Sequence, residues 1–336
     1  MKATAGLRAV TTARGRMPCW QAALLGLAVL LSGSLGAQNV SSGHPEVIDE
    51  IVVTGERAGP SMWHVRKGDA HVWILGSMSP LPRGITWRSR QVEDVLAHAD
   101  QVLVQKPVEI SVPRVLWMLI TNRSLVMVTG GKRLKDVMPA QLHDRFAALR
   151  NQYTEEDNKW ERYRPIVATL FLQQAAFHQA GLSLRMDMGA AVRKLAKDAR
   201  VKVDEIKMAG VGDMFDALKT LSPDAENTCV NASLVTIQSA IPLYKERAQA
   251  WADGDVERLQ SLPVPREVDA CRAAMDQGKG AADLLTRMRQ SWLFALEKEL
   301  KAPGTSIAVI NLDLLLDKGG VLDGLRAAGF EISAPQ

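Results

Sequence analysis

A chain of 336 residues is long enough to bury a large hydrophobic core, as one large domain or as two. Its 47% hydrophobic and 23% charged residues are those of an ordinary globular protein. The formal net charge of +4 comes from Lys2, Arg8, Arg14 and Arg16, because no acidic residue precedes Ala37. The rest of the chain is formally neutral, so composition argues against a polyanion-binding protein, and nucleic acid is not an expected partner.

Residues 1–37 are typical of a secretory signal peptide. An arginine-bearing start leads into the apolar run Ala22–Leu31, and the small residues of Ser32–Ala37 follow. We expect cleavage after Ala37, although Leu35 is unusual three residues before a cleavage site. A retained membrane anchor is the alternative, but the run is nearer ten than the roughly 20 residues that span a bilayer. No second long apolar run follows, so we expect no stable membrane insertion after cleavage.

Residues 38–60 are polar and rich in Ser, Gly, Glu and Pro, which is typical of a linker. The apolar stretch Ile48–Val53 within it is a candidate for a short edge strand. We therefore predict one folded domain over residues 61–336.

The domain is predicted to begin with a β-hairpin. Two strand-forming segments, Met62–Val65 and His71–Leu75, flank Lys67–Asp69, and Gly-Asp in such a gap favours a tight turn. His64 and His71 would then lie on neighbouring strands. A half-exposed cross-strand contact and a metal site are both open for this pair.

The stretch His71–Pro107 predicts a strand, a loop, a helix and a second strand. The apolar run Val72–Leu75 ends in a loop rich in Gly and Pro, Gly76–Gly84. An amphipathic helix and the strand Gln101–Gln105 follow. Ligands of such units bind where the loop leaves the carboxyl end of the first strand, so we expect any site to involve this loop.

Helical patterns predominate from about Val112 to Leu300, interrupted by a strand near Val201–Ile206. The chain then repeats the β-loop-α-β layout with Ser306–Ile310, Gly320–Ala328 and Phe330–Ile332. The predicted fold is α/β (mixed α+β), with a central sheet from two β-loop-α-β halves and a large helical insertion between them. The helices predicted in the later part of the insertion are Gly189–Ala199, Met214–Thr220, Thr228–Trp251, Val268–Asp276 and Ala281–Leu300.

Two cysteines remain after the signal peptide, Cys229 and Cys271, both near the ends of predicted helices. Such a pair in an exported protein favours a disulfide. Two free buried thiols, or a metal or redox role, are the alternatives.

Short motifs spread over most of the mature chain form a recognisable set. They are Ser61–Val65, Leu75–Pro82, Ile85–Trp87, Tyr163–Pro165, Gly320–Leu325 and Ala328–Phe330. In these motifs the chain resembles the TraB/GumN (TraB, PrgY, GumN) family, of which the Tiki metalloproteases are distant relatives. The resemblance implies a Gram-negative periplasmic or secreted location.

The resemblance also implies where a metal would bind in catalytic relatives. They carry Gly-x-x-His after the first sheet strand and again in the last unit, and a glutamate at the end of the strand after the first helix. Two imidazoles and a carboxylate hold a divalent metal that activates water. This chain has Ser79, Gln105 and Leu314 at those positions, and none of these is a comparable ligand. We therefore predict a degenerate site with no metal and no cofactor.

Other side chains near the same loop are candidates for binding. Asp313 and Asp317 lie in the loop facing the first unit, either as a polar cluster with Ser79 or simply as acids at a helix start. Gly76 and Ser79 of the first loop and Asp313 are therefore candidate binding residues. Ser79 lacks the Gly-x-Ser-x-Gly setting of a nucleophile.

Arg83 and Trp87, with Arg88 and Arg90, follow the loop closely. They are candidates for binding an anionic or sugar-like ligand. The alternative is a core tryptophan next to solvated arginines.

The sequence thus predicts a periplasmic or secreted member of the family that has lost the metalloprotease site. Such a pseudoenzyme would bind an unknown peptide, protein or glycan at the old cleft, and the GumN resemblance hints at exopolysaccharide production. The alternatives are a metal-dependent peptidase of the TraB/Tiki type with a rebuilt site, and a structural envelope protein without a small ligand.

Overall fold

The computed structural model describes residues 59–107, 113, 117, 120–155, 160–184, 187–208, 210–263 and 266–335. These residues belong to one compact unit, Gly55–Gln336. The predicted signal peptide, nearly all of the predicted linker and the strand predicted at Ile48–Val53 lie outside the described residues. Within the described ranges, no helix combines the length and the apolar character needed to cross a bilayer.

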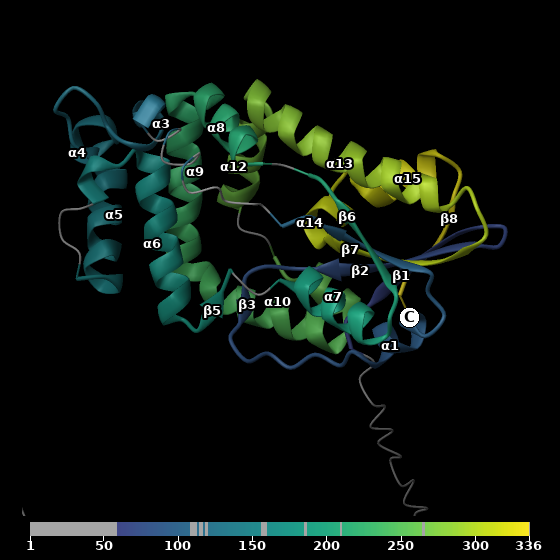
Figure 1. The fold of residues 1–336 in the computed structure, drawn as a ribbon. Coiled ribbons are helices and arrows are strands. Elements are labelled where there is room, and N and C mark those ends of the chain that lie inside the picture. The colour runs from purple at the N-terminus through teal and green to yellow at the C-terminus, as the bar shows by residue number, and fades with distance from the viewer. Residues whose placement is uncertain are drawn as a thin grey trace, which may run out of the picture. The chain divides into compact units, whose positions relative to one another are not determined.

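A six-stranded sheet forms the centre of the fold, with the strand order β6-β4-β7-β2-β1-β8 (Figure 1). The four strands β6, β4, β7 and β2 run parallel, whereas β1 is antiparallel to both β2 and β8. The carboxyl ends of the four parallel strands therefore meet at one edge. The strand bounds are β1 Met62–Lys67, β2 Ala70–Ser77, β4 Gln101–Gln105, β6 Lys202–Ile206, β7 Gly304–Asn311 and β8 Glu331–Ser333.

The predicted mixed α/β class is confirmed, but the two β-loop-α-β units do not form separate halves of the sheet. They interleave, because β7 of the last unit lies between β2 and β4 of the first. Residues Ser306–Ile310 of β7 are all buried, which suits a strand covered on both faces rather than one at a boundary.

Helices cover both faces of this sheet. Figure 1 shows α13, α14 and α15 on one side and α1, α7 and α10 on the other. The sheet and these helices share one hydrophobic core, in which Trp292 of α13 and Ile74 of β2 are almost completely buried. The bounds of these helices are α1 Arg90–Leu96, α7 Met188–Asp198, α10 Ile241–Asp253, α13 Lys279–Glu299, α14 Leu312–Leu316 and α15 Val321–Ala327.

The predicted hairpin between β1 and β2 is confirmed. Lys67 pairs with Ala70, so Gly68 and Asp69 form the turn, and Gly68 has a φ of 59° that favours glycine. The register brings His64 and His71 together, with 3.0 Å between Nε2 of His64 and Nδ1 of His71. The His64 ring also stacks on the indole of Trp73, so the pair forms a half-buried cross-strand contact.

This histidine pair is expected to make the protein less stable in mild acid. Burial lowers the pKa of His64 below its ordinary value of 6.5, and the neighbouring His71 and Arg66 lower it further. The unfolded chain then binds a proton at this imidazole where the folded chain does not, so the free energy of unfolding falls as the pH drops below 6.5 toward the folded pKa. Urea titrations at about pH 7.5 and about pH 5.5 measure this loss, which should be smaller in His64→Gln. Equal losses in both proteins would contradict the prediction.

The helical insertion has a second hydrophobic core of its own. Phe146 of α5, Leu172 of α6 and Leu234 of α9 are fully buried in it. The other α-helices in the described residues are α3 Arg123–Val126, α4 Leu134–Val137, α5 Ala140–Tyr153, α6 Pro165–Gln179, α8 Val211–Thr220, α9 Pro223–Val235, α11 Val256–Ser261 and α12 Arg266–Asp276.

One helical run links the two cores. The single helix predicted over Thr228–Trp251 is instead α9, a π-helical turn over Thr236–Ala240, and α10. Pro242 has no N–H to donate to a carbonyl in the preceding turn, which accounts for the break in the α-helical pattern.

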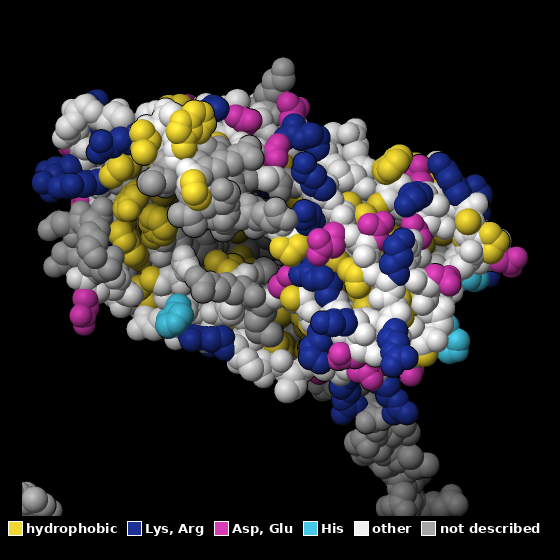
Figure 2. Space-filling view, in the orientation of Figure 1, with side chains coloured by type: hydrophobic (Ala, Val, Ile, Leu, Met, Phe, Trp, Pro, Cys, Tyr) yellow, Lys and Arg dark blue, Asp and Glu magenta, His cyan; other side chains and the backbone are white. Residues whose placement is uncertain are grey.

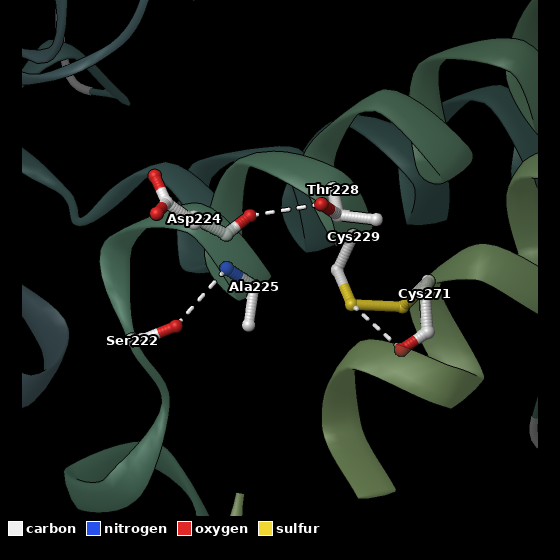
Figure 3. The surroundings of a disulfide bond; sticks show 6 residues. All are labelled: Ser222, Asp224, Ala225, Thr228, Cys229 and Cys271. Carbon is white, nitrogen blue, oxygen red and sulfur yellow. Dashed lines mark hydrogen bonds between the residues drawn. A yellow bond between two sulfur atoms is a disulfide. The ribbon is translucent and has the colours of Figure 1, made fainter. Parts of the chain in front are cut away.

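The predicted disulfide is confirmed, and it joins α9 to α12 through Cys229 and Cys271 (Figure 3). Helix α9 begins earlier than predicted because Ser222 caps it, with its Oγ accepting from the backbone N–H of Ala225 at 3.2 Å. Both cysteines consequently lie inside helices rather than near helix ends.

Candidate functional site

The loops of interest lie where the parallel strands end. Ser77 at the end of β2 pairs with Asn311 at the end of β7, and Gln105 ends the neighbouring β4. The crevice at this edge is the usual ligand position in a sheet of parallel strands.

A cavity of about 80 Å³ lies at this edge, between the ends of β2 and β7 and the helices α10 and α12. Its volume is close to that of a single apolar side chain rather than of a large ligand. The apolar residues lining it are Met78, Ala240, Leu243, Pro263, Val268 and Leu312, and the polar ones are Ser79, Tyr244, Arg247, Arg272, Asn311 and Asp313.

The strand side of the cavity carries Ser79, Asn311 and Asp313. Asn311 is the N-cap of α14, and its Oδ1 accepts from the backbone N–H groups of Asp313 and Leu314 at 2.9 and 3.3 Å. These two hydrogen bonds fix the turn between β7 and α14. The structure therefore brings Ser79 and Asp313 to one cavity, and Asp313 is also an acid in the first turn of a helix.

The helical side carries Tyr244 and Arg247, one turn apart on α10. Burial raises the pKa of the Tyr244 phenol above its usual value, and Asp313 raises it as well, whereas the hydrogen bond to Thr236 and the charge of Arg247 oppose the shift. Both charges thus act on the Tyr244 phenol, Asp313 by raising its pKa and Arg247 by lowering it.

Arg272 of α12 connects the helical side to the loop after α14. Its Nη1 lies 2.9 Å from Oδ1 of Asp317. Burial raises the pKa of Asp317 and the charge of Asp313 adds to this shift, whereas the charge and hydrogen bond of Arg272 oppose it. The guanidinium of Arg272 therefore already forms an ion pair with a carboxylate of this chain.

Gly76 lies beside the cavity but has a packing role. Its carbonyl oxygen accepts a buried hydrogen bond of 2.7 Å from Nε1 of Trp251. A Cβ at Gly76 would lie 2.3 Å from Cδ2 of Leu312 and 3.0 Å from Cζ3 of Trp63. Only glycine lets these side chains approach the strand so closely.

We expect Gly76→Ala to destabilise the protein by about 1–3 kcal/mol, because the added methyl group overpacks the space held by Leu312 and Trp63. Urea unfolding measures the loss. Gly212→Ala in α8 is the matched control, since a Cβ there meets no atom within 4 Å and alanine favours a helix. A Gly76→Ala protein as stable as the wild type would show that the site tolerates the methyl group.

The structure places Arg83 and Trp87 away from the cavity. Arg83 donates to the backbone carbonyl of His178 at the end of α6, next to the short pairing of β3 (Leu81–Pro82) with β5 (Leu182–Ser183). Trp87 packs against the core around the sheet. These residues attach the loop to the insertion and to the core, and the two do not meet in one site.

A second and wider hollow, of about 690 Å³, lies on the helical insertion. Figure 2 shows hydrophobic side chains gathered on this part of the surface, whereas Lys, Arg, Asp and Glu are intermixed over the other side of the same face. None of the residues that the sequence marks for chemistry lines this hollow, so the cavity at the strand ends is the candidate site. The hollow is lined by Tyr153, Trp160, Tyr163, Phe171, Gln174, Ala175, His178 and Gln179.

Comparison with known proteins agrees with the resemblance in the motifs. The sequence model of the TraB/PrgY/gumN family matches residues 61–334. The chain belongs to this family. Searches of curated proteins and of solved structures give no significant match.

The metal implied by catalytic members of the TraB/PrgY/gumN family does not fit the residues present. Leu314 is 9% exposed and belongs to the core. Gln105 is exposed at the end of β4, and its backbone carbonyl accepts a hydrogen bond from Arg193. Across the part of the chain that the structure describes, no three His, Cys, Asp or Glu side chains gather as metal ligands. These positions offer no equivalent of two imidazoles and a carboxylate.

Sequence reasoning missed three polar residues of this TraB/PrgY/gumN member, Tyr244, Arg247 and Arg272. Pro242 was the available signal, because a proline inside a predicted helix marks a break, and breaks of this kind are common at functional sites. No pattern pointed to Arg272, whose position depends on the docking of α12.

Proposed function

We propose that this TraB/PrgY/gumN family protein is a non-catalytic member that binds a ligand in the cavity at the strand ends. The observation that carries the proposal is the identity of the residues at the family's expected metal positions, Ser79, Gln105 and Leu314. A hydroxyl, an amide and a buried leucine do not supply the ligand set that activates water.

A peptide is the occupant that the lining favours among the peptide, protein or glycan predicted from sequence. The cavity is lined by several apolar residues and by both an acidic and a basic side chain, Asp313 and Arg247. Peptides offer apolar side chains and groups of both charges, whereas a neutral glycan offers neither. A glycan partner, with a link to exopolysaccharide production, is the competing outcome of the test below.

The test is elemental analysis of the purified protein together with mass spectrometry of co-purifying ligands. We expect no stoichiometric zinc, manganese or cobalt, and peptides rather than sugars among the bound molecules. A peptide that binds should be recovered uncut after incubation. Stoichiometric metal with peptide cleavage would reject the proposal.

A hydrolase with a rebuilt site is the second candidate, and the shared cavity of Ser79 and Asp313 favours it. Cleavage lost in both Ser79→Ala and Asp313→Ala, but retained in Gln105→Ala, would support this candidate.

Export is part of the proposal, with a periplasmic or secreted protein that loses residues 1–37. The arginine-bearing start and the apolar run support it. Amino-terminal sequencing of the protein from the periplasmic or culture fraction should begin at Gln38. A start at Met1 in the membrane fraction would support the retained anchor instead.

A further inference from the structure

Arg247 differs from the other arginine of the cavity in what it binds. Its Nη1 donates to the backbone carbonyl of Leu259 at 3.3 Å. In the described part of the chain, no carboxylate forms an ion pair with Arg247, whereas Arg272 is paired with Asp317. Arg247 is half-buried and lines the cavity, so a charged group with remaining donors faces a partly desolvated space.

The neighbours of Arg247 also suit an anionic group. Tyr244 lies one turn away on the same helix and lines the same cavity. A guanidinium with a phenol beside it gives several donors to an oxyanion.

The other residues that line the cavity suit the groups next to that anion in a peptide. Asp313 and Asn311 line the cavity from the strand ends, and a carboxylate there accepts an N–H group. Met78, Leu243 and Leu312 are apolar lining residues of this cavity of about 80 Å³, a volume close to that of one apolar side chain. A carboxylate, an amide N–H and an apolar side chain occur together at the last residue of a peptide.

We propose that the cavity selects the free carboxyl terminus of a peptide ending in an apolar residue, with Arg247 as the specificity-determining side chain. This inference rests on the proposed peptide-binding function. The carboxylate binds Arg247 and Tyr244, the last side chain packs against the apolar lining residues, and the last amide N–H faces Asp313. No covalent step is involved.

The test uses two pools of N-acetylated tetrapeptides with mixed first three residues and a last residue of Leu, Val or Met. One pool has free carboxyl termini and the other has carboxamides. The two pools are mixed in equal amounts and incubated together with the whole protein, and the bound peptides are separated by ultrafiltration and quantified by mass spectrometry. A charge-assisted hydrogen bond in a partly buried site predicts that the acids are enriched about tenfold or more over the amides. The ratio is measured within one protein sample, so it does not depend on the folded fraction.

Arg247→Gln should bring the ratio of acid to amide close to one, and Arg247→Lys should keep part of the preference because the charge remains. Lys245→Gln is the matched control, since it removes one positive charge from an exposed position on the same helix. A preference that also disappears in Lys245→Gln would assign it to general charge and overturn the inference. Equal enrichment of acids and amides by the wild type would overturn the inference and leave the peptide-binding function standing. Enrichment of neither pool would overturn both.

Discussion

Replacing Arg164 with methionine is expected to destabilise the protein by about 3–5 kcal/mol, because it leaves a buried carboxylate without its positively charged partner. The Nε of Arg164 lies 2.9 Å from Oε2 of Glu226, and the two side chains are only 16% and 8% exposed. The same guanidinium donates to the backbone carbonyls of Leu218 and Leu221, at 2.9 and 3.2 Å. Arg164 therefore joins the start of α6 to α9 and to the end of α8. Urea unfolding of the purified variant measures the loss.

Arg326→Met is the matched control for Arg164→Met. Arg326 forms an ion pair with Asp323 of comparable length, 2.9 Å, but the side chains are 57% and 48% exposed. Such a pair contributes less than about 1 kcal/mol. Adding Glu226→Leu to Arg164→Met should recover part of the loss, because no charge then stays buried. If the free energy of unfolding falls by the same small amount in both arginine variants, the buried ion pair does not contribute the stability that its geometry indicates.

Removing the disulfide is expected to have an effect of similar size. Cys229 and Cys271 are separated by 42 residues, and closing a loop of this length lowers the entropy of the unfolded chain by the equivalent of about 4 kcal/mol. Replacing both cysteines with alanine should lower the urea midpoint accordingly. The wild type in reductant should fall to about the same midpoint, and the double variant should not respond to reductant.

The disulfide also supports one wall of the cavity. Helix α12 carries Cys271 together with Val268 and Arg272, which line the cavity. Hydrogen exchange in α12 should therefore rise more in the double variant than exchange in α5, which lies in the second core. Uniform exchange across both helices would show that the bond acts on overall stability alone.

The secondary structure followed from local patterns where one residue decides the conformation. Gly68 in the hairpin marks a boundary that the structure confirms. The order of the strands could not be deduced in this way. The order depends on which buried strand lies in the middle of the sheet. Hydrophobic periodicity does not show which of β2, β4 and β7 takes that position.

The position of the candidate site could also be predicted in part from the sequence. The loop after β2 and the loop after β7 were both suspected because a parallel sheet brings strand ends together, and Ser79 and Asp313 do line one cavity. Arg83 and Trp87 follow the first loop closely in sequence, but the chain turns toward α6 before it reaches them. Tyr244, Arg247 and Arg272 come from distant helices, and only the packing of the insertion brings them to the strand ends.

The central position of β7 has a consequence for the order of folding. β7 lies between β2 and β4, so these two earlier strands do not pair with each other. Both pair with β7, which is synthesised near the end of the chain. The insertion has its own core between α5, α6 and α9 and does not depend on that partner. A ribosome-bound chain that stops before Gly304 is therefore expected to hold a folded helical part and an open sheet with its inner edges exposed to chaperones and proteases.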